Sequence, residues 1–391
     1  MNYILFDSKA RNALLPFTFT KPVADIRVGI LSLREKWEKH LTASTSTITE
    51  KYLEQKYPAT YSEANILLNA TIIPTKPLVK LVKNLKPKQA LYKGGELIAY
   101  FTTDCQEVVN FSNYEKIEYK GQLVQIKNTW DIFSLNAQAI NLDFNLLTEG
   151  RKSEPIPSTV NYINKDAIFI EKGADLNFAT LNASTGPIYL GKNTLLMEGC
   201  LIRGGFALCE GSVVKMGSKI YGATTIGPYS KVGGEINNSV LFGCSNKGHE
   251  GYLGNSVLGE WCNLGADTNN SNLKNNYAQV RLWNYNTGKF DKTGLQFCGL
   301  IMGDHSKCGI NTMFNTGTVV GVSANIFGSG FPRNFIPSFS WGGVSGFTEY
   351  KTEKVFEVVK LVMQRRGIDF AESEKNILNH IFEKTKKYRN Y

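Results

Sequence analysis

The sequence predicts a mixed α/β domain, then a three-sided parallel β-solenoid, then a short helical tail. The main observation is a six-residue repeat in which a branched aliphatic side chain recurs eight times in succession. These positions are Leu190, Leu196, Ile202, Leu208, Val214, Ile220, Ile226 and Val232. A helix has a period of 3.6 residues and cannot produce this spacing, whereas short strands joined at corners can. Two further observations are that residues 1–150 lack the repeat and that apolar residues recur at helical spacing after residue 350.

Six residues would form one flat face of a coil, and three faces would complete one turn. The aliphatic residue points inward, and we expect a second inward residue four positions later, near a corner. These second positions are Thr194, Cys200, Phe206, Ser212, Ser218, Thr224, Ser230 and Ile236. The repeat returns at Tyr252, Leu258 and Leu264, and again at Met302, Cys308, Phe314, Val320 and Ile326. Each coil buries its apolar side only by stacking on the next, which predicts a continuous array.

The first domain is expected to span residues 1–150. Short apolar runs bounded by turn residues predict strands at 3–6, 66–68, 71–73 and 97–101. Helical spacing predicts helices at 30–40, 129–135 and 137–147. Mixed strands and helices of this kind indicate an α/β domain.

The second and third domains are expected at 151–346 and 347–391. Residues 149–158 hold two prolines, a glycine and four charges, which predicts a linker. Breaks in the repeat at 232–252 and 269–299 are interpreted as insertions, which in solenoids usually form loops on the working side. The coils are expected to end near Gly330, with Trp341-Gly-Gly turning the chain away. The tail is predicted to form helices at 352–366 and 373–387, the second capped by Ser373.

Composition narrows the function classes. The chain has 391 residues, 42% of them hydrophobic and 20% charged, and no apolar run long enough to span a bilayer. Its start lacks the organisation of a signal peptide, and its seven cysteines suit reduced thiols, so we expect a cytoplasmic protein. Cys200, Cys262 and Cys308 fall on inward positions and are expected to fill the core. The net charge of +10 is spread along the chain, which favours anionic metabolites over nucleic acid or membrane as partners.

The most polar stretch is Ser245-Asn-Lys-Gly-His-Glu-Gly-Tyr-Leu-Gly-Asn255, which contains one of only four histidines in the sequence. Histidine suits general-base chemistry near neutral pH. From spacing alone, a solvated or structural histidine remains an alternative.

Here the sequence resembles a known family. The run Asn246-Lys-Gly-His249, then Tyr252-Leu-Gly, then Gly259-Glu-Trp-Cys-Asn-Leu-Gly-Ala-Asp-Thr268 is similar to the acetyltransferase half of the bifunctional uridyltransferase/acetyltransferase that makes UDP-N-acetylglucosamine. The whole chain resembles the alternative bacterial form of that enzyme. The resemblance implies a left-handed parallel β-helix of hexapeptide repeats after a nucleotidyltransferase-like domain. It also implies acetyl-CoA as acyl donor, an amino-sugar phosphate as acceptor, and a homotrimer with the acyl donor between neighbouring subunits.

The resemblance assigns roles to individual residues. His249 matches the catalytic base that takes a proton from the sugar amine. Tyr252 and Asn263 match positions that contact the amino-sugar phosphate, and Asn272 matches a polar position beside the amine. Ala266 matches a position where a backbone group meets the acyl donor.

This sequence also departs from the family pattern. Asn237 replaces a substrate-binding lysine, and Lys219 replaces an arginine that would hold the sugar phosphate; both are still expected to contact substrate, as is Lys247. Asp267 replaces a glycine and Leu273 replaces a tyrosine. An ammonium cannot form the bidentate contact of a guanidinium, so these departures bear on the identity of the acceptor and not on the acyl transfer.

The segment Arg11-Asn-Ala-Leu-Leu-Pro-Phe-Thr-Phe-Thr-Lys-Pro22 resembles the opening signature of sugar nucleotidyltransferases. In that family an arginine and a lysine at the positions of Arg11 and Lys21 grip the nucleoside triphosphate and sugar phosphate, with Mg²⁺ as cofactor. The glycine-rich stretch before the arginine is here Asp7-Ser-Lys-Ala, which cannot cradle a triphosphate in the same way. Asp104 and Asp131 are candidate metal ligands only.

Three alternatives to a bifunctional enzyme remain at this point. The chain could be a single-activity nucleotidyltransferase whose solenoid is a trimerising scaffold. It could be a non-catalytic assembly subunit, although the polar stretch at 245–255 argues against this. A metal-dependent solenoid hydratase needs about three histidine ligands, and the predicted solenoid holds only His249 and His305.

Overall fold

The computed structural model describes residues 1–103 and 111–391, which form two compact units. The first comprises Met1–Leu14, Lys21–Ile26 and Leu31–Asn128, and the second comprises Leu15–Thr20, Arg27–Ile30 and Thr129–Tyr391. The division falls before residue 150 because α3 (Asp131–Ser134) and α4 (Asn136–Thr148) belong to the solenoid unit. The Asn136 amide, at the start of α4, donates to the Ala223 carbonyl (2.7 Å).

The first unit is built on a mixed sheet with strand order β2-β1-β3-β6-β5-β7. Its strands are β1 (Asn2–Phe6), β2 (Ser46–Ile48), β3 (Asn65–Asn69), β5 (Gln89–Lys93), β6 (Glu96–Thr102) and β7 (Glu115–Glu118), with the pair β4 (Ile72–Ile73) and β8 (Val124–Gln125) beside it. Its helices are α1 (Leu33–Leu41) and α2 (Lys76–Lys83). These elements confirm the predicted α/β character of this part of the chain.

Helix α1 begins later than predicted because Ser32 caps it. The Ser32 hydroxyl accepts from the Glu35 N–H (3.2 Å), and the Glu35 carboxylate accepts from the Ser32 N–H (2.6 Å). This reciprocal pair satisfies amide groups that the first helical turn leaves unpaired. The buried Trp37 then anchors the helix by donating to the Ile72 carbonyl (3.1 Å).

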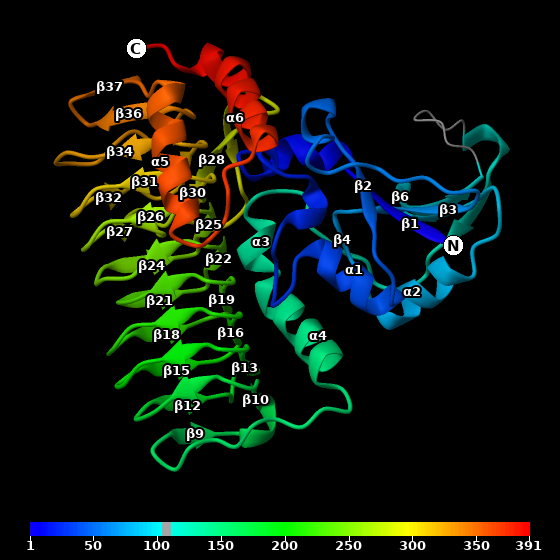
Figure 1. The fold of residues 1–391 in the computed structure, drawn as a ribbon, viewed down its shortest axis with the longest axis horizontal. Helices are drawn as coiled ribbons and strands as arrows, with labels where there is room; N and C mark the ends of the chain where they lie inside the picture. The colour runs from blue at the N-terminus through cyan, green and yellow to red at the C-terminus, as the bar shows by residue number, and fades with distance from the viewer. Residues whose placement is uncertain (104–110) are drawn as a thin grey trace. The chain divides into compact units, whose positions relative to one another are not determined.

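The second unit is a three-sided stack of parallel strands, which confirms the predicted β-helix (Figure 1). The first face consists of β10 (Ile168–Ile170), β13 (Ile188–Leu190), β16 (Phe206–Leu208), β19 (Thr224–Ile226), β22 (Val240–Gly243), β25 (Val257–Glu260), β30 (Leu300–Met302), β33 (Thr318–Val320) and β35 (Phe335–Ile336). The second face consists of β11 (Asp175–Leu176), β14 (Leu195–Leu196), β17 (Val213–Val214), β20 (Lys231–Val232), β23 (Asn246–Lys247), β26 (Asn263–Leu264), β31 (Lys307–Cys308), β34 (Asn325–Ile326) and β36 (Ser340–Gly343). The third face consists of β9 (Asn161–Ile163), β12 (Thr180–Asn182), β15 (Leu201–Arg203), β18 (Lys219–Tyr221), β21 (Glu235–Asn237) and β24 (Tyr252–Gly254), followed by β27 (Asn269–Asn270) and β32 (Met313–Phe314).

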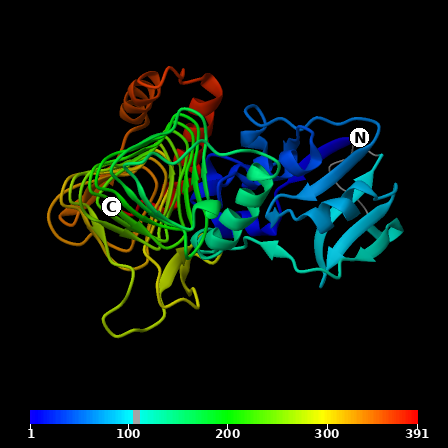
Figure 2. The same cartoon turned by 90° about the horizontal axis from the view of Figure 1, so that it is seen from below.

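The interior of the stack is the predicted column of aliphatic residues. All eight repeat positions from Leu190 to Val232 are at most 2% exposed, and the serine, threonine and cysteine positions near the corners are buried as well. Figure 2 looks along the stack and shows the coils superimposed. Tyr252 is an exception to the prediction: Leu253 pairs with Ile236 and faces inward, so Tyr252 faces outward.

The predicted insertion at 232–252 is wrong, because the coils there are shortened. Register pairs Leu208 with Ile226, 18 residues on, but Ile226 with Leu241, only 15 residues on. The next coil pairs Leu241 with Leu258, 17 residues on. The ladder therefore continues without interruption, and residues 248–251 form a corner turn rather than an inserted loop.

The second predicted insertion is confirmed, and it carries an antiparallel hairpin of β28 (Arg281–Asn284) and β29 (Lys289–Lys292). The coils do not end near Gly330, because β35 and β36 add to the first and second faces. The antiparallel strand β37 (Gly346–Glu349) then closes the second face. Helices α5 (Thr352–Gln364) and α6 (Glu372–Thr385) follow; Ala371 precedes α6, so Ser373 lies inside the helix and is not its cap.

Segments from the start of the chain cover the outer side of the first face. Phe17 packs on Phe242 with ring centroids 4.9 Å apart, and the Thr20 hydroxyl donates to the Asp304 carboxylate (2.6 Å). The Arg27 guanidinium donates to the Phe242 carbonyl (3.1 Å). Outward residues of the first face are accordingly buried, whereas the second and third faces present exposed side chains.

Candidate acyl-transfer site

His249 is exposed in the 248–251 turn, which joins the second face to the third. We call the turns that join these faces along the stack the His249 corner; they include residues 177–178, 215–217, 248–251, 265–268, 309–312 and 327–330. Backbone hydrogen bonds connect successive turns: the Asp267 N–H donates to the Glu250 carbonyl (3.1 Å), and the Asn311 N–H donates to the Ala266 carbonyl (2.8 Å). His249 is thus held on a hydrogen-bonded edge while its ring faces solvent.

The third face places expected substrate residues side by side. Register aligns Lys219, Glu235 and Tyr252 on neighbouring strands, and aligns Tyr221 with Asn237. Side chains of one face recur every second residue, so these five point outward together. The Tyr221 hydroxyl donates to the Glu235 carboxylate (2.5 Å), and this bond raises the pKa of Tyr221.

The sequence analysis missed Tyr221 and Glu235. Each lies two residues from a predicted substrate residue, Lys219 and Asn237 respectively. A strand period of two would have found them once the strand was assigned. They add a carboxylate to a face for which only cationic and neutral contacts were expected.

Tyr252 and Asn272 form a small polar network beside the turn. The Asn272 amide donates to the Tyr252 hydroxyl (3.0 Å) and to the Asn255 side-chain oxygen (2.7 Å). Both amide hydrogens of Asn272 are then in use, which leaves its carbonyl oxygen to meet an amine. The Asn269 side-chain oxygen accepts from the Tyr252 N–H (2.8 Å) and fixes the strand that bears the phenol.

Asn263 is exposed on the second face, across the corner from Tyr252. Its neighbours in register are Asn246 and Lys307. The expected substrate residues therefore lie on two faces that meet at His249. A small substrate cannot lie flat on both faces of one prism, which becomes important for the proposed assembly.

Lys247 is not at the surface. It pairs in register with Val232 and occupies an inward position in the column of core residues, with 1% of its surface exposed. Its ammonium donates to the carbonyls of Gly233 (3.0 Å), His249 (2.5 Å) and Glu250 (2.9 Å). The expected contact between Lys247 and substrate is therefore wrong, because the side chain is enclosed by the coil.

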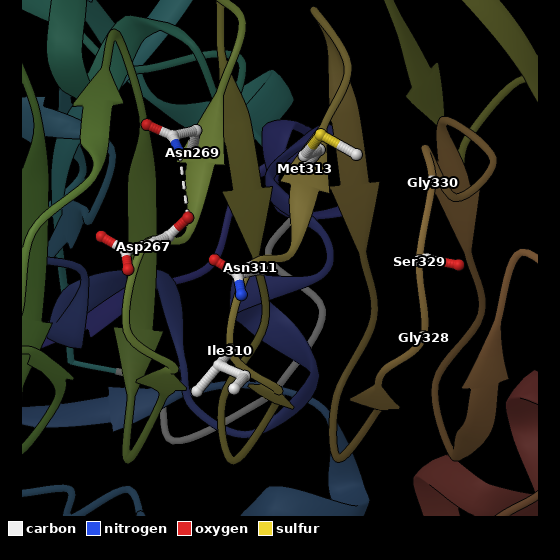
Figure 3. A pocket seen from close by; sticks show the side chains of 8 residues that line it. All are labelled: Asp267, Asn269, Ile310, Asn311, Met313, Gly328, Ser329 and Gly330. Carbon is white, nitrogen blue, oxygen red and sulfur yellow. Dashed lines mark hydrogen bonds between the residues drawn. The ribbon is translucent and has the colours of Figure 1, made fainter.

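A groove of about 480 Å³ runs along the corner on the far side of Ala266 (Figure 3). Its lining residues are Asp267, Asn269, Ile310, Asn311, Met313, Gly328, Ser329 and Gly330. Asp267 has a φ of 55°, in the left-handed region that favours glycine, the residue that the resemblance leads us to expect there. Its carboxylate gives this otherwise neutral groove a negative charge.

In the first unit, Arg11 lies in the turn that follows β1. Its guanidinium donates to the Asp7 carboxylate (3.0 Å) and to the Tyr52 hydroxyl (3.1 Å). Asp7 also accepts from the Thr49 hydroxyl (2.6 Å) and from the Val23 N–H (2.8 Å). Burial raises the pKa of the Asp7 carboxyl, while these donors and Arg11 act in the opposite direction.

A shallow groove of about 240 Å³ adjoins this arginine, lined by Asp7, Ser8, Lys9, Arg11, Asn12, Ile48, Thr49 and Glu50. Lys21 does not line it, and it is only 2% exposed. The structure therefore places Arg11, which is itself only 5% exposed, on the lining of this groove, but not Lys21. A triphosphate there would have to compete with Asp7 for the guanidinium.

The donor set for Mg²⁺ is not assembled in the described residues. Within 1–103 and 111–391, His, Cys, Asp and Glu form no group of three or more that could hold a metal ion. Asp104 lies outside the described residues, and Asp131 lies in the first turn of α3, in the second unit.

Comparisons with known proteins assign a family to the amino-terminal part of the chain, including α3 and α4. Residues 3–152 match the family model described as sugar nucleotidyl transferase. The amino-terminal part is a nucleotidyltransferase-like domain. This match confirms the resemblance predicted from the Arg11–Pro22 signature.

Relatives extend the similarity into the solenoid. A bifunctional sugar-1-phosphate nucleotidylyltransferase/acetyltransferase of Sulfurisphaera tokodaii is 28% identical over 223 residues, covering 54% of this chain and 46% of its own length. The bifunctional protein GlmU of Methanococcus vannielii is 24% identical over 267 residues, covering 66% of this chain and 55% of its own length. The chain thus spans about half the length of the curated relatives it matches.

Among solved structures, LpxA, a UDP-N-acetylglucosamine acyltransferase from Bacteroides fragilis, aligns with a TM-score of 0.26 and 14% sequence identity. The alignment covers 60% of this chain and 84% of that one. In the described part of the chain, none of the helices is long and apolar enough to cross a membrane.

Proposed function

We propose that the solenoid transfers an acetyl group from acetyl-CoA to glucosamine 1-phosphate or a related amino-sugar phosphate. We propose further that the first domain transfers a nucleotidyl group from UTP or another nucleoside triphosphate to the resulting sugar 1-phosphate. The observation that carries the first proposal is the exposed His249 at the corner between Tyr252 on the third face and Asn263 on the second. The observation that carries the second is the family match over residues 3–152.

The chemistry assigns one task to each group at this corner. The nitrogen of the substrate amine forms a bond to the thioester carbonyl carbon, and His249 takes the proton that this nitrogen loses. The tetrahedral intermediate collapses, the carbon–sulfur bond breaks, and the thiol of CoA leaves with a proton. Lys219 and the Tyr252 hydroxyl face the sugar phosphate, and the Asn272 oxygen orients the amine.

The groove beyond Ala266 is the proposed place of the acyl donor. It adjoins the same edge as His249, one turn along the stack, so the thioester would end near the imidazole. Backbone N–H groups at such corners are fixed donors, suited to the oxyanion that develops during acyl transfer.

A homotrimer with the His249 corner at the subunit seam is part of the proposal. Exposed apolar side chains gather along this corner: Phe178 is 66% exposed, Met216 65% and Ile310 69%. Soluble monomers rarely leave such a row uncovered. A neighbouring copy would cover it and would also bring a second face toward Tyr252, which resolves the separation of Asn263 from the other substrate residues.

The first domain would use the groove at Arg11 for an anionic substrate. Arg11 is held in place by Asp7 and Tyr52, so its guanidinium is oriented before a phosphate arrives. A cytoplasmic location, expected from the reduced cysteines, completes the proposal.

The deciding experiment replaces the imidazole. His249→Ala should lower CoA release with acetyl-CoA and glucosamine 1-phosphate at least about a hundredfold, because general-base catalysis is worth that much or more. A thiol reagent follows the release, and Glu210→Ala, an exposed change in the turn between β16 and β17 on another corner, is the matched control. Undiminished turnover in His249→Ala would remove this residue from the mechanism.

The same assay separates the alternatives. If the wild-type protein releases no CoA with a panel of amino-sugar phosphates, yet releases pyrophosphate from a nucleoside triphosphate and a sugar 1-phosphate, the solenoid is a scaffold. If neither product forms, the chain is a non-catalytic subunit.

A further inference from the structure

In the inward column of the solenoid, the charged residue Lys247 occupies a position where the repeat predicts an aliphatic residue. Val232 and Leu264 flank Lys247 in register on the second face, and both are buried core residues. An isolated ammonium is costly to bury unless its hydrogen-bonding capacity is met. Here the capacity is met, since three carbonyls receive its three N–H groups.

Two of those carbonyls belong to the turn that carries the proposed base. The His249 and Glu250 carbonyls point inward to the ammonium, while the His249 side chain is exposed outside. The third carbonyl, of Gly233, belongs to the preceding coil. The side chain therefore connects the 248–251 turn to the coil before it, from inside the prism.

Besides the ammonium, a backbone hydrogen bond holds this turn to the preceding coil: the Glu235 N–H donates to the Gly251 carbonyl (3.3 Å). The outward side of the turn is exposed at His249 and Glu250, and a corner of this kind depends on backbone hydrogen bonds between coils. The Asp267 N–H already occupies one side of the Glu250 carbonyl (3.1 Å). Removing the ammonium would leave the inward carbonyls without their donor, and the turn would relax toward solvent.

We propose that Lys247 is a positioning residue for acetyl transfer: its enclosed ammonium fixes the turn that presents His249. The proposal rests on the proposed function for its catalytic meaning. Its structural part, the restraint of residues 248–251, does not depend on that function.

The restraint is expected to depend on pH. Burial lowers the pKa of Lys247 to about 8, and the nearby groups Glu250, Asp267 and Cys308 act in the opposite direction. A turn that opens to solvent would return the Lys247 side chain to water, where its pKa is higher, so the closed turn should gain protection as pH rises through about 8.

The test replaces the ammonium by an apolar side chain of similar length. In Lys247→Met, amide hydrogen exchange of residues 248–251 should be at least about tenfold faster than in the wild type, as expected when local opening becomes easier. The kcat for CoA release should fall about tenfold to a hundredfold while the KM for the amino-sugar phosphate changes little, because the base and not the binding face is misplaced. Leu264→Met, a conservative core change at the adjacent inward position, is the matched control and should show neither effect.

Unchanged exchange at 248–251 in Lys247→Met would overturn the proposal, whatever the activity. Absence of CoA release from the wild type would instead remove the proposed function, and the exchange comparison would still decide the restraint. If Lys247→Met does not fold, the test is made on the wild-type protein by measuring amide exchange as a function of pH. Between pH 7 and 9.5, exchange at 248–251 should accelerate less than the intrinsic chemical rate, because a closed turn that buries Lys247 gains protection over this range, whereas residues 226–232 should follow the intrinsic rate. Equal pH dependence in the two segments would contradict the proposal.

Discussion

Asp267, at the His249 corner, has a left-handed backbone conformation and also carries a negative charge. Its left-handed φ of 55° is one that asparagine and aspartate tolerate better than other residues with a side chain. Its carboxylate lines the groove proposed for acetyl-CoA, which carries several phosphates. The sequence departure from glycine thus has a cost for the proposed ligand, and this cost can be measured.

Asp267→Asn should improve the binding of acetyl-CoA without changing the fold. The asparagine keeps the left-handed backbone and removes the repulsion, which in a solvent-exposed groove is worth no more than about 1 kcal/mol, or roughly fivefold in KM. Initial rates of CoA release against acetyl-CoA concentration provide the measurement, with the exposed Glu210→Gln on another corner as control. A higher KM in Asp267→Asn would mean that the carboxylate assists binding.

At the scale of elements, the linker is held to the first coil by a charged cluster. The two terminal nitrogens of the Arg151 guanidinium donate to the two oxygens of the Glu171 carboxylate (2.9 and 2.7 Å). The Tyr189 hydroxyl donates to the same carboxylate (2.7 Å). Burial opposes ionisation of Glu171, but these donors outweigh it and hold the pKa of the carboxyl below its usual range. Residues 149–158, predicted as a linker, therefore include an anchored segment.

This anchoring predicts a stability that depends on pH. A carboxyl whose folded pKa is depressed stabilises the fold above its unfolded pKa, about 4.3, and the contribution disappears as pH falls through the lower folded value. Glu171→Gln should weaken the first coil by about 1 kcal/mol at pH 7, a modest amount because the Arg151 side chain is 45% exposed.

Hydrogen exchange of residues 168–176 measures that local stability. Wild type and Glu171→Gln should converge as the pH falls through the depressed folded pKa of Glu171, and Glu154→Gln, an exposed change in the same linker, should resemble wild type at each pH. A difference between Glu171→Gln and wild type that does not diminish as the pH falls below about 4 would show that the effect is not ionic.

The elements also show how far sequence reasoning can reach. The six-residue repeat predicted every inward position from Leu190 to Val232. Side chains alternate inward and outward along each short strand of a solenoid, so the spacing of apolar residues in the sequence marks the core. The repeat also predicted the inward positions from Leu258 to Ile326, and it failed only between Val232 and Leu258, for two physical reasons. The coils become shorter there, and Lys247 occupies an inward position that an aliphatic residue would mark. A strand-by-strand register was needed to see that Leu253, and not Tyr252, continues the core.

At the scale of the whole solenoid, the residues of the candidate site lie on more than one face. The sequence alone identified several of these residues but not how the fold places them relative to one another. The resemblance supplied His249, Tyr252 and Asn272, and the structure brings the last two within 3.0 Å. It could not supply Tyr221 or Glu235, which become neighbours only through parallel pairing. Nor could it show that the exposed apolar residues Phe178 and Met216 share the corner of His249, since 38 residues separate them in the chain.

That shared corner leads to a prediction about assembly. If a neighbouring copy covers the row, two charges placed on it should dissociate the oligomer, since like charges in an apolar seam are desolvated without partners. Phe178→Glu combined with Met216→Glu should sediment as a monomer and should lose CoA release, although neither residue lines the groove or bears a proposed catalytic group. Leu361→Glu, an apolar position on α5 that is 63% exposed, is the control and should remain assembled. A double variant that sediments like an oligomeric wild type would show that this row is not the seam. A wild type that is already a monomer would place the acyl-transfer site within one subunit, and Asn263 would then have no part in it.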